Sequence, residues 1–143
     1  MLIESDILVA YLKKEDWLKS VATRVIEDAK SGKFGRVQVS TEVFHELYYV
    51  FSEYTSLDVI ATDFAHIIGL KNVEIVPATA EIYLSAINLM LMYNISSIFD
   101  AIYAATALSP MVPDNTILST DRVYDRIPGI KRIDPRSMYS EHI

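Results

Sequence analysis

The chain contains no cysteine among its 143 residues. This absence excludes disulfide bonds, thiolate metal centres and cysteine nucleophiles, and it fits the reducing conditions of the cytoplasm, where we expect the protein to act. Glycine is also scarce, at four residues. No glycine-rich phosphate loop is present, which argues against a phosphatase or a nucleotide-binding protein of that kind.

Long apolar runs are missing as well, and no segment approaches the length of a membrane span. The first residues lack the basic stretch of a signal peptide and carry an acid at Glu4. We therefore expect no membrane association. Positive charge is in deficit, with 13 Lys and Arg against 19 Asp and Glu, a net charge of -6. This balance argues against a protein that coats nucleic acid by charge alone, but it is compatible with an acidic site that binds cations.

The composition that remains is that of a packed globular chain, with 51% hydrophobic residues and a length that suits one domain over residues 1–143. Short apolar segments, "MLIES", "RVQVST", "VEIVP" and "TILST", alternate with helical patterns, and "GIKRID" is typical of an edge strand. This alternation predicts an α/β fold in three layers, with a central parallel sheet of four or five strands flanked by helices.

Two helical segments have features that matter later. The amphipathic helix expected from Trp17 to about Ser31 should be broken by Gly32 and Gly35. The segment "ATAEIYLSAINLMLMYN" has almost no polar face in its second half. Such a helix is predicted to be buried either in the core or against a partner.

Acidic residues follow the predicted strands. Asp6 follows the first strand, and Asp121 follows "TILS". The helix after the second strand carries Glu42 and Glu46, and Asp100 opens the alanine-rich helix "IFDAIYAATAL". Because functional residues of such sheets gather at the carboxyl ends of the strands, acids from four segments are expected to meet there. Clustered carboxylates need neutralising cations, and hard oxygen ligands favour Mg²⁺ or Mn²⁺.

Each acid also has a purely structural interpretation. Asp6 and Asp121 could cap the helical segments that follow them. Asp100 lies three residues after Ser97, which matches the capping-box pattern. Glu46 could lie on an exposed helix face, the usual place for a glutamate. The joint pattern, rather than any single acid, favours a metal site.

Four segments resemble the motifs of the PIN domain family, and most closely those of its VapC-type toxin ribonucleases from prokaryotic toxin–antitoxin pairs. "ESDILVAYL" resembles the opening strand, whose first acid matches Asp6. "VQVSTEVFHELYY" resembles the second strand and helix, where the family acid matches Glu46 rather than Glu42. "IFDAIYAATAL" resembles the third motif, with its acid at Asp100.

The last motif is similar to "ILSTDRVYDRIPGIKRIDP", in which a hydroxyl residue precedes an Asp and an aromatic residue follows three positions later. The matching residues are Ser119, Thr120, Asp121 and Tyr124. One departure concerns Ile7, because the family usually has Thr, Ser or Asn after the first Asp. Ser5 would point to the opposite side of the strand and could not replace that group.

The resemblance implies a divalent-metal-dependent endoribonuclease that hydrolyses RNA phosphodiester bonds with a metal-activated water. It also implies an RNA substrate, a cognate antitoxin and a homodimer as partners, and Mg²⁺ or Mn²⁺ as cofactor. Ser119 and Thr120 would support the ligands or the phosphate. The implied metal-binding and catalytic residues are Asp6, Glu46, Asp100 and Asp121.

Two alternatives stay open. The chain could be a PIN-fold RNA-processing nuclease without an antitoxin, or a non-catalytic module that binds RNA or a protein partner, for which Ile7 is the one hint. The histidines show no metal-ligand spacing. Basic residues near the last motif could line an RNA path or form a mixed solvated surface; they are Arg122, Arg126, Lys131, Arg132 and Arg136.

Overall fold

A computed structural model describes residues 1–139. Five strands form one sheet in the order β3-β2-β1-β4-β5, and all neighbouring pairs are parallel. The strands are β1 (Leu2–Ile3), β2 (Val37–Ser40), β3 (Val73–Val76), β4 (Thr116–Leu118) and β5 (Lys131–Ile133). The predicted parallel α/β sheet is confirmed, and "GIKRID" forms the expected edge strand.

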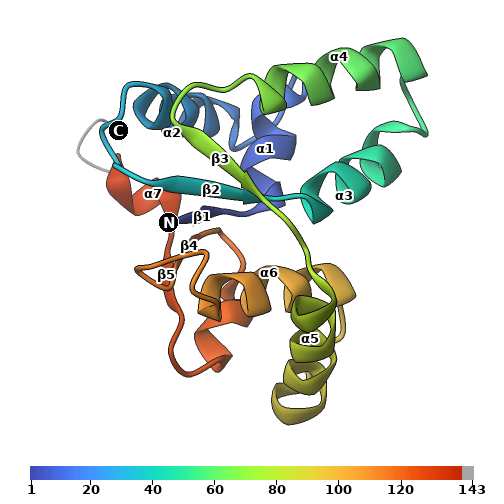
Figure 1. Cartoon of the computed structure of the whole chain (residues 1–143). Coiled ribbons are helices and arrows are strands. Elements are labelled where there is room, and N and C mark those ends of the chain that lie inside the picture. Colours follow the sequence, from blue (N-terminus) through green and yellow to red (C-terminus); the bar gives the residue numbers. More distant parts are fainter. Residues whose placement is uncertain (140–143) are drawn as a thin grey trace.

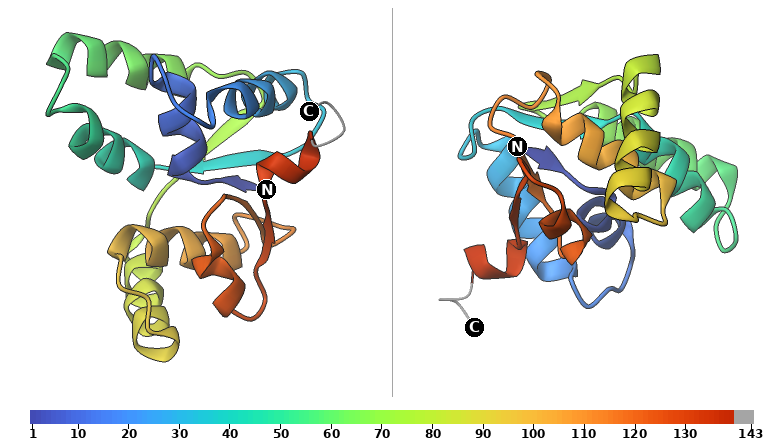
Figure 2. Two further views of the ribbon diagram at one scale, coloured as in Figure 1. Left: turned by 180° about the vertical axis from the view of Figure 1, so that it is seen from behind. Right: turned by 90° about the horizontal axis from the view of Figure 1, so that it is seen from below.

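Helices cover both faces of this sheet. Figure 1 shows α1, α2 and α4 on one side and α5 and α6 on the other, and Figure 2 shows the same layers from behind and from below. The helices are α1 (Ser5–Leu12), α2 (Lys19–Lys30), α3 (Glu42–Phe51), α4 (Leu57–Ile68), α5 (Ala80–Tyr93), α6 (Ile98–Leu108), the 3₁₀ helix η1 (Arg122–Arg126) and α7 (Pro135–Met138).

Helix α6 is the most deeply buried helix in the described part of the chain. Every residue from 101 to 107 is buried, and four of these seven are alanines. Small side chains let the helix backbone approach β1 and β4 closely, and the helix contacts both strands. The close packing fixes the position of the first turn of α6, which carries Asp100.

Strand β1 lies at the centre of the sheet, between β2 and β4. The chain builds β2 and β3 on one side of β1 and only afterwards adds β4 and β5 on the other side. The chain thus extends the sheet in opposite directions on the two sides of β1. Where the strand order reverses in this way, a crevice opens at the carboxyl ends of the strands, and α/β proteins bind their ligands there. In this chain the crevice lies beyond the ends of β1 and β4.

Two local predictions differ from the structure near this crevice. Strand β1 ends at Ile3, so Asp6 lies in the first turn of α1 and does not itself cap the helix. Glu4 is the N-cap residue, and its Oε2 accepts a hydrogen bond of 2.7 Å from the Asp6 amide. Ser5 is consequently a helical residue that faces the crevice, not a strand residue turned away from it.

Helix α2 begins at Lys19, two residues later than predicted, because residues 16–18 form a turn. It ends before Gly32 and Gly35, whose φ angles of 83° and 67° a helix cannot contain. Helix α5 is not buried in the core as one prediction had it. Only Ile82, Ala86 and Leu89 of α5 are buried, and most of its apolar side chains face solvent.

No single helix within residues 1–139 is long and apolar enough to cross a membrane. Helices α5 and α6 together reach the required length and composition, but they are bent by 109° at the break between them.

Candidate active site

The four predicted acids line one pocket of about 320 Å³ beyond the ends of β1 and β4. They come from separate elements, namely α1, α3, α6 and the turn after β4, and are Asp6, Glu46, Asp100 and Asp121. Glu4, Ser5, Asp16 and Thr120 complete the polar lining. The fold therefore brings together four acids that are up to 115 positions apart in the sequence.

Asp6 is fixed by the turn after β4. The Thr120 amide and hydroxyl both donate to its Oδ2, at 2.9 and 2.7 Å. Its other oxygen, Oδ1, is buried and has no hydrogen-bond partner within the described residues. Ile7 packs in the core, so the hydroxyl next to Asp6 comes from Thr120 instead. A buried carboxylate oxygen without a partner is costly, and it marks a position that a cation would satisfy.

Glu46 is held by a buried phenol. The Tyr103 hydroxyl on α6 donates to Glu46 Oε1 at 2.7 Å. Burial and the neighbouring Glu46 raise the pKa of Tyr103, so this phenol remains a proton donor at all physiological pH values. Glu42, one turn earlier, lies outside the pocket and instead accepts a hydrogen bond of 2.8 Å from Tyr83. The structure thus separates the two glutamates of α3 into different environments.

Asp100 occupies the first turn of α6, where Ser97 is the N-cap and accepts from the Asp100 amide at 3.4 Å. The cap therefore uses the backbone of Asp100, and its carboxylate faces the pocket. Burial, followed by repulsion from Asp121 and Glu46, raises the pKa of Asp100 to about 6. Half-buried acids that repel one another are typical of sites that hold cations.

Asp121 has two roles in the structure. Its Oδ1 caps η1 by accepting from the Val123 amide at 2.9 Å, as the capping interpretation predicts, and the residue also lines the pocket. Ser119, which was expected to support the ligand residues or the phosphate, is fully buried beneath the turn and does not line the pocket. Its Oγ accepts from the Asp121 amide at 3.0 Å, so it shapes the turn from below.

Glu4 is a functional candidate that the sequence analysis missed. It is 4% exposed, yet it lines the pocket next to Asp6. The Tyr124 hydroxyl donates to its Oε1 at 3.1 Å. Burial, followed by the charge of Asp6, raises the pKa of Glu4 well above its usual range. The signal available in the sequence was an acid directly after a short apolar segment, as in "LIES".

A divalent cation such as Mg²⁺ needs several oxygen ligands that converge on one point. Within residues 1–139 no three Asp, Glu, His or Cys side chains are arranged, as they stand, to hold a metal ion. None of the four acids forms an ion pair within this part of the chain either. The chemistry of the pocket nevertheless suits a hard cation such as Mg²⁺ or Mn²⁺. Among the described residues its carboxylates have no positively charged partner, one oxygen of Asp6 has no hydrogen-bond partner, and the pKa of Asp100 is raised.

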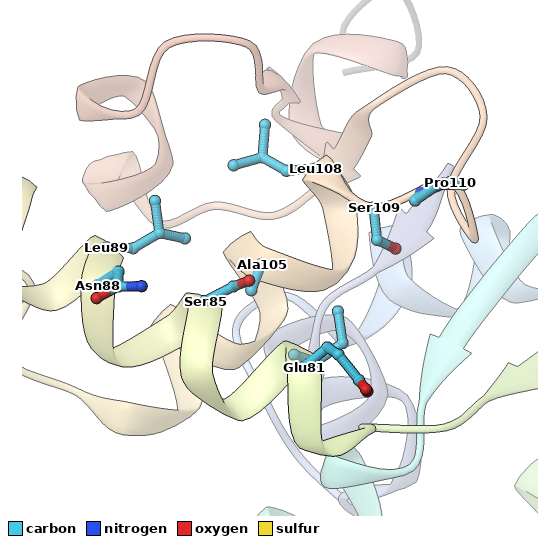
Figure 3. A pocket seen from close by; sticks show the side chains of 9 residues that line it. Glu81, Ser85, Asn88, Leu89, Ala105, Leu108, Ser109 and Pro110 are labelled. Atoms are coloured by element: carbon cyan, nitrogen blue, oxygen red, sulfur yellow. The ribbon is translucent and has the colours of Figure 1, made fainter.

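A larger hollow of about 470 Å³ lies between α5 and α6 (Figure 3). Its walls are apolar side chains, two serines and an amide, with Glu81 as the one acid. It therefore offers no pair of titratable groups for acid–base chemistry or for holding a cation. The smaller carboxylate pocket has the features of an active site.

Comparison with known proteins assigns the chain to a family. Residues 1–130 match the family model of the PIN domain. The chain belongs to the PIN domain family, as the resemblance of its four motifs implied.

Solved structures that resemble the chain include several toxin–antitoxin proteins. VapBC2 from Rickettsia felis, bound to a DNA fragment from its promoter, matches with a TM-score of 0.69 and 17% identity, over 92% of this chain and 96% of that one. VapC20 from Mycobacterium tuberculosis, a toxin that cleaves the sarcin–ricin loop, matches with a TM-score of 0.70 and 15% identity, over 87% and 92%.

A toxin–antitoxin complex from Klebsiella pneumoniae matches with a TM-score of 0.63 and 17% identity, over 94% of this chain and 96% of that chain. At these identities the likeness establishes the fold. A search among curated proteins finds no significant match.

Proposed function

We propose that the chain is a divalent-metal-dependent endoribonuclease that acts in the cytoplasm as the toxin of a toxin–antitoxin pair. The observation that carries this proposal is the pocket in which Asp6, Glu46, Asp100 and Asp121 meet without a compensating positive side chain. Membership of the PIN domain family and the VapC-like fold support it.

The roles of the residues follow from their contacts. Asp6 and Asp100 are the ligands that the surrounding structure fixes best, because Thr120 orients the first and the packing of α6 positions the second. A bound divalent cation supplies the positive charge that makes water a nucleophile towards a phosphodiester at neutral pH. Glu46, oriented by Tyr103, is placed to align the attacking water and accept its proton.

The decisive experiment is the cleavage of a panel of end-labelled RNAs with Mg²⁺, with Mn²⁺ and with EDTA. Two pocket variants, Asp100→Asn and Glu46→Gln, are compared with the wild type. Glu42→Gln is a matched control, because it alters a glutamate of the same helix outside the pocket. We expect metal-dependent cleavage by the wild type and by Glu42→Gln, and a loss of at least about a hundredfold in both pocket variants.

If the wild type binds RNA but cuts none with either metal, the non-catalytic alternative replaces the nuclease. Equal cleavage by Glu46→Gln and the wild type would remove Glu46 from the mechanism.

The toxin assignment is tested separately, by expressing the chain with and without the product of a neighbouring short reading frame. Growth arrest that the second protein relieves supports a toxin, whereas growth unaffected by the chain alone favours an RNA-processing nuclease.

We also propose that the protein forms a homodimer through α5. The exposed side of this helix carries Leu84, Leu91 and Met92, and Leu91 is 79% exposed. Apolar side chains grouped on one helix face indicate an interface rather than a solvated surface. Sedimentation velocity of the purified chain measures this association directly, and a monomer at micromolar concentration would contradict it.

A further inference from the structure

We propose that Trp17 is a base-stacking platform that positions the nucleotide next to the scissile phosphate. The inference rests on the proposed ribonuclease function and adds a substrate-positioning residue to it. Trp17 lines the same pocket as the four acids, although it belongs to the turn before α2. Neither the motif residues nor the family resemblance singled out this position.

The indole ring of Trp17 is exposed to solvent. Trp17 is the one tryptophan of the chain, and it is 71% exposed at the rim of the pocket. Tryptophan has the largest apolar side chain, and leaving it in water forfeits a large gain in free energy. An aromatic plane at the mouth of an active site is suited to receive a flat ligand, and nucleobases are flat ligands.

The turn that carries the ring is fixed. The Leu18 amide donates to Asp16 Oδ1 at 2.9 Å, and the Leu18 side chain is buried at 2% exposure. The Lys19 ammonium donates to the carbonyl oxygens of Tyr11, at 2.7 Å, and Lys13. Because residues on both sides of Trp17 are anchored, binding a base would cost little conformational entropy at this position.

A guanidinium holds one face of the indole. The Cζ atom of Arg136 on α7 lies 5.3 Å from the ring centroid, within the range of a cation–π contact. Asp134 keeps Arg136 in place, with Nη2 to Oδ2 at 2.6 Å and Nε to Oδ1 at 3.0 Å. With Arg136 against one face, the exposed remainder of the ring is available for a base.

The distribution of charge explains why stacking is needed. The pocket is acidic and the chain carries a net charge of -6, so the protein repels the phosphates of RNA over long range. Two of the basic residues near the last motif are already paired, Arg132 with Asp125 at 2.9 Å and Arg136 with Asp134. Stacking on an aromatic plane does not depend on net charge, and it is a main source of affinity for unpaired RNA.

The fluorescence of Trp17 reports directly on whether a base stacks against its ring. Asp100→Asn protein is titrated with single-stranded decamers of adenylate, of uridylate and of abasic ribose phosphate, while tryptophan emission is recorded. We expect saturable quenching by the two base-containing RNAs, tighter for adenylate because purines stack better, and none by the abasic chain. RNA that binds, as seen by anisotropy of a labelled decamer, without changing the emission overturns the proposal.

Variants separate stacking from folding. In anisotropy titrations Trp17→Ala should weaken RNA binding about tenfold or more, and Trp17→Phe, which retains a plane, should restore most of the affinity. Tyr54→Ala, at an aromatic residue that is 59% exposed outside the pocket, is the matched control and should bind like its parent. Equal affinity of Trp17→Ala and Tyr54→Ala contradicts the proposal.

Cleavage kinetics distinguish this inference from the proposed function. In an active protein Trp17→Ala should raise KM about tenfold and change kcat only a few-fold, whereas an unchanged KM refutes the platform and leaves the nuclease intact. If the wild type cuts no RNA, the nuclease proposal fails but the emission titration still decides the platform. If Trp17→Ala binds RNA normally but loses its response to a cognate antitoxin, Trp17 belongs to a protein interface and the proposal is wrong.

Discussion

Replacement of Asp100 by Asn should stabilise the metal-free protein while it abolishes cleavage. In the folded chain the pKa of Asp100 is about 6, against 3.8 for an ordinary aspartate, because of burial and repulsion from Asp121 and Glu46. A group whose folded pKa is raised contributes stability below its unfolded pKa and loses it as the pH rises through the folded pKa. Ionised Asp100 therefore weakens the fold at neutral pH, and a neutral amide of the same shape does not.

The size of this effect follows from the shift. Two pH units correspond to about 3 kcal/mol, and solvent screening of a half-exposed carboxylate reduces this to about 1–2 kcal/mol. The free energy of unfolding of Asp100→Asn should exceed that of the wild type by an amount that grows between pH 4 and 6 and stays constant above about pH 7. Urea denaturation in EDTA, in half-unit pH steps from 4.5 to 8, measures it.

The exposed acid Glu53 provides a control, since Glu53→Gln should change the unfolding free energy little at any pH. Millimolar Mg²⁺ should reverse the order and stabilise the wild type more than Asp100→Asn, because a cation binds the folded carboxylates. A purely structural role for Asp100 at the start of α6 predicts a different change in stability. If Asp100 only complements the dipole of α6, Asp100→Asn is about 0.3–1 kcal/mol less stable at pH 8, which would refute the reasoning.

Three further changes test other parts of the structure. Tyr103→Phe removes the 2.7 Å hydrogen bond to Glu46 and should cost about 1–3 kcal/mol in urea denaturation and lower the cleavage rate. Leu91→Glu should convert a dimer to a monomer in sedimentation velocity without changing monomer stability, because the side chain is 79% exposed. Asn115→Ala should cost about 1–3 kcal/mol by thermal denaturation, because Asn115 has a φ of 53° and donates to the Ala107 carbonyl at 2.9 Å.

The sequence predicted the sheet and the meeting of the four acids because both depend on one strong pattern. Apolar strands that alternate with helices allow few topologies, and in a parallel sheet the residues after the strands share one edge. Glu46 and Glu42 were separated by family resemblance alone, since both lie on the same amphipathic helix. Their different partners, Tyr103 and Tyr83, come from α6 and α5 and are visible only in three dimensions.

The errors came from boundaries and from burial. Because the first strand ends at Ile3 and the chain turns into α1 at Ser5, Glu4 and Ser5 line the pocket instead of alternating across a strand. The apolar composition of α5 could not tell a core helix from one that awaits a partner. Trp17 has no motif around it, because its position beside the acids arises from packing of the turn before α2.

The order of the strands has a consequence for the timing of synthesis. Strand β1 is the first to leave the ribosome, but its neighbour β4 begins at Thr116, and the hydrogen bonds from Thr120 to Asp6 span 114 residues. When a hundred residues have been synthesised, Asp6 and Glu46 are already part of the nascent chain. The turn at Thr120, which orients Asp6 and completes the pocket, has not yet been made. The carboxylate pocket therefore cannot be completed on the nascent chain until Thr120 has been made, and the fold itself sets this delay.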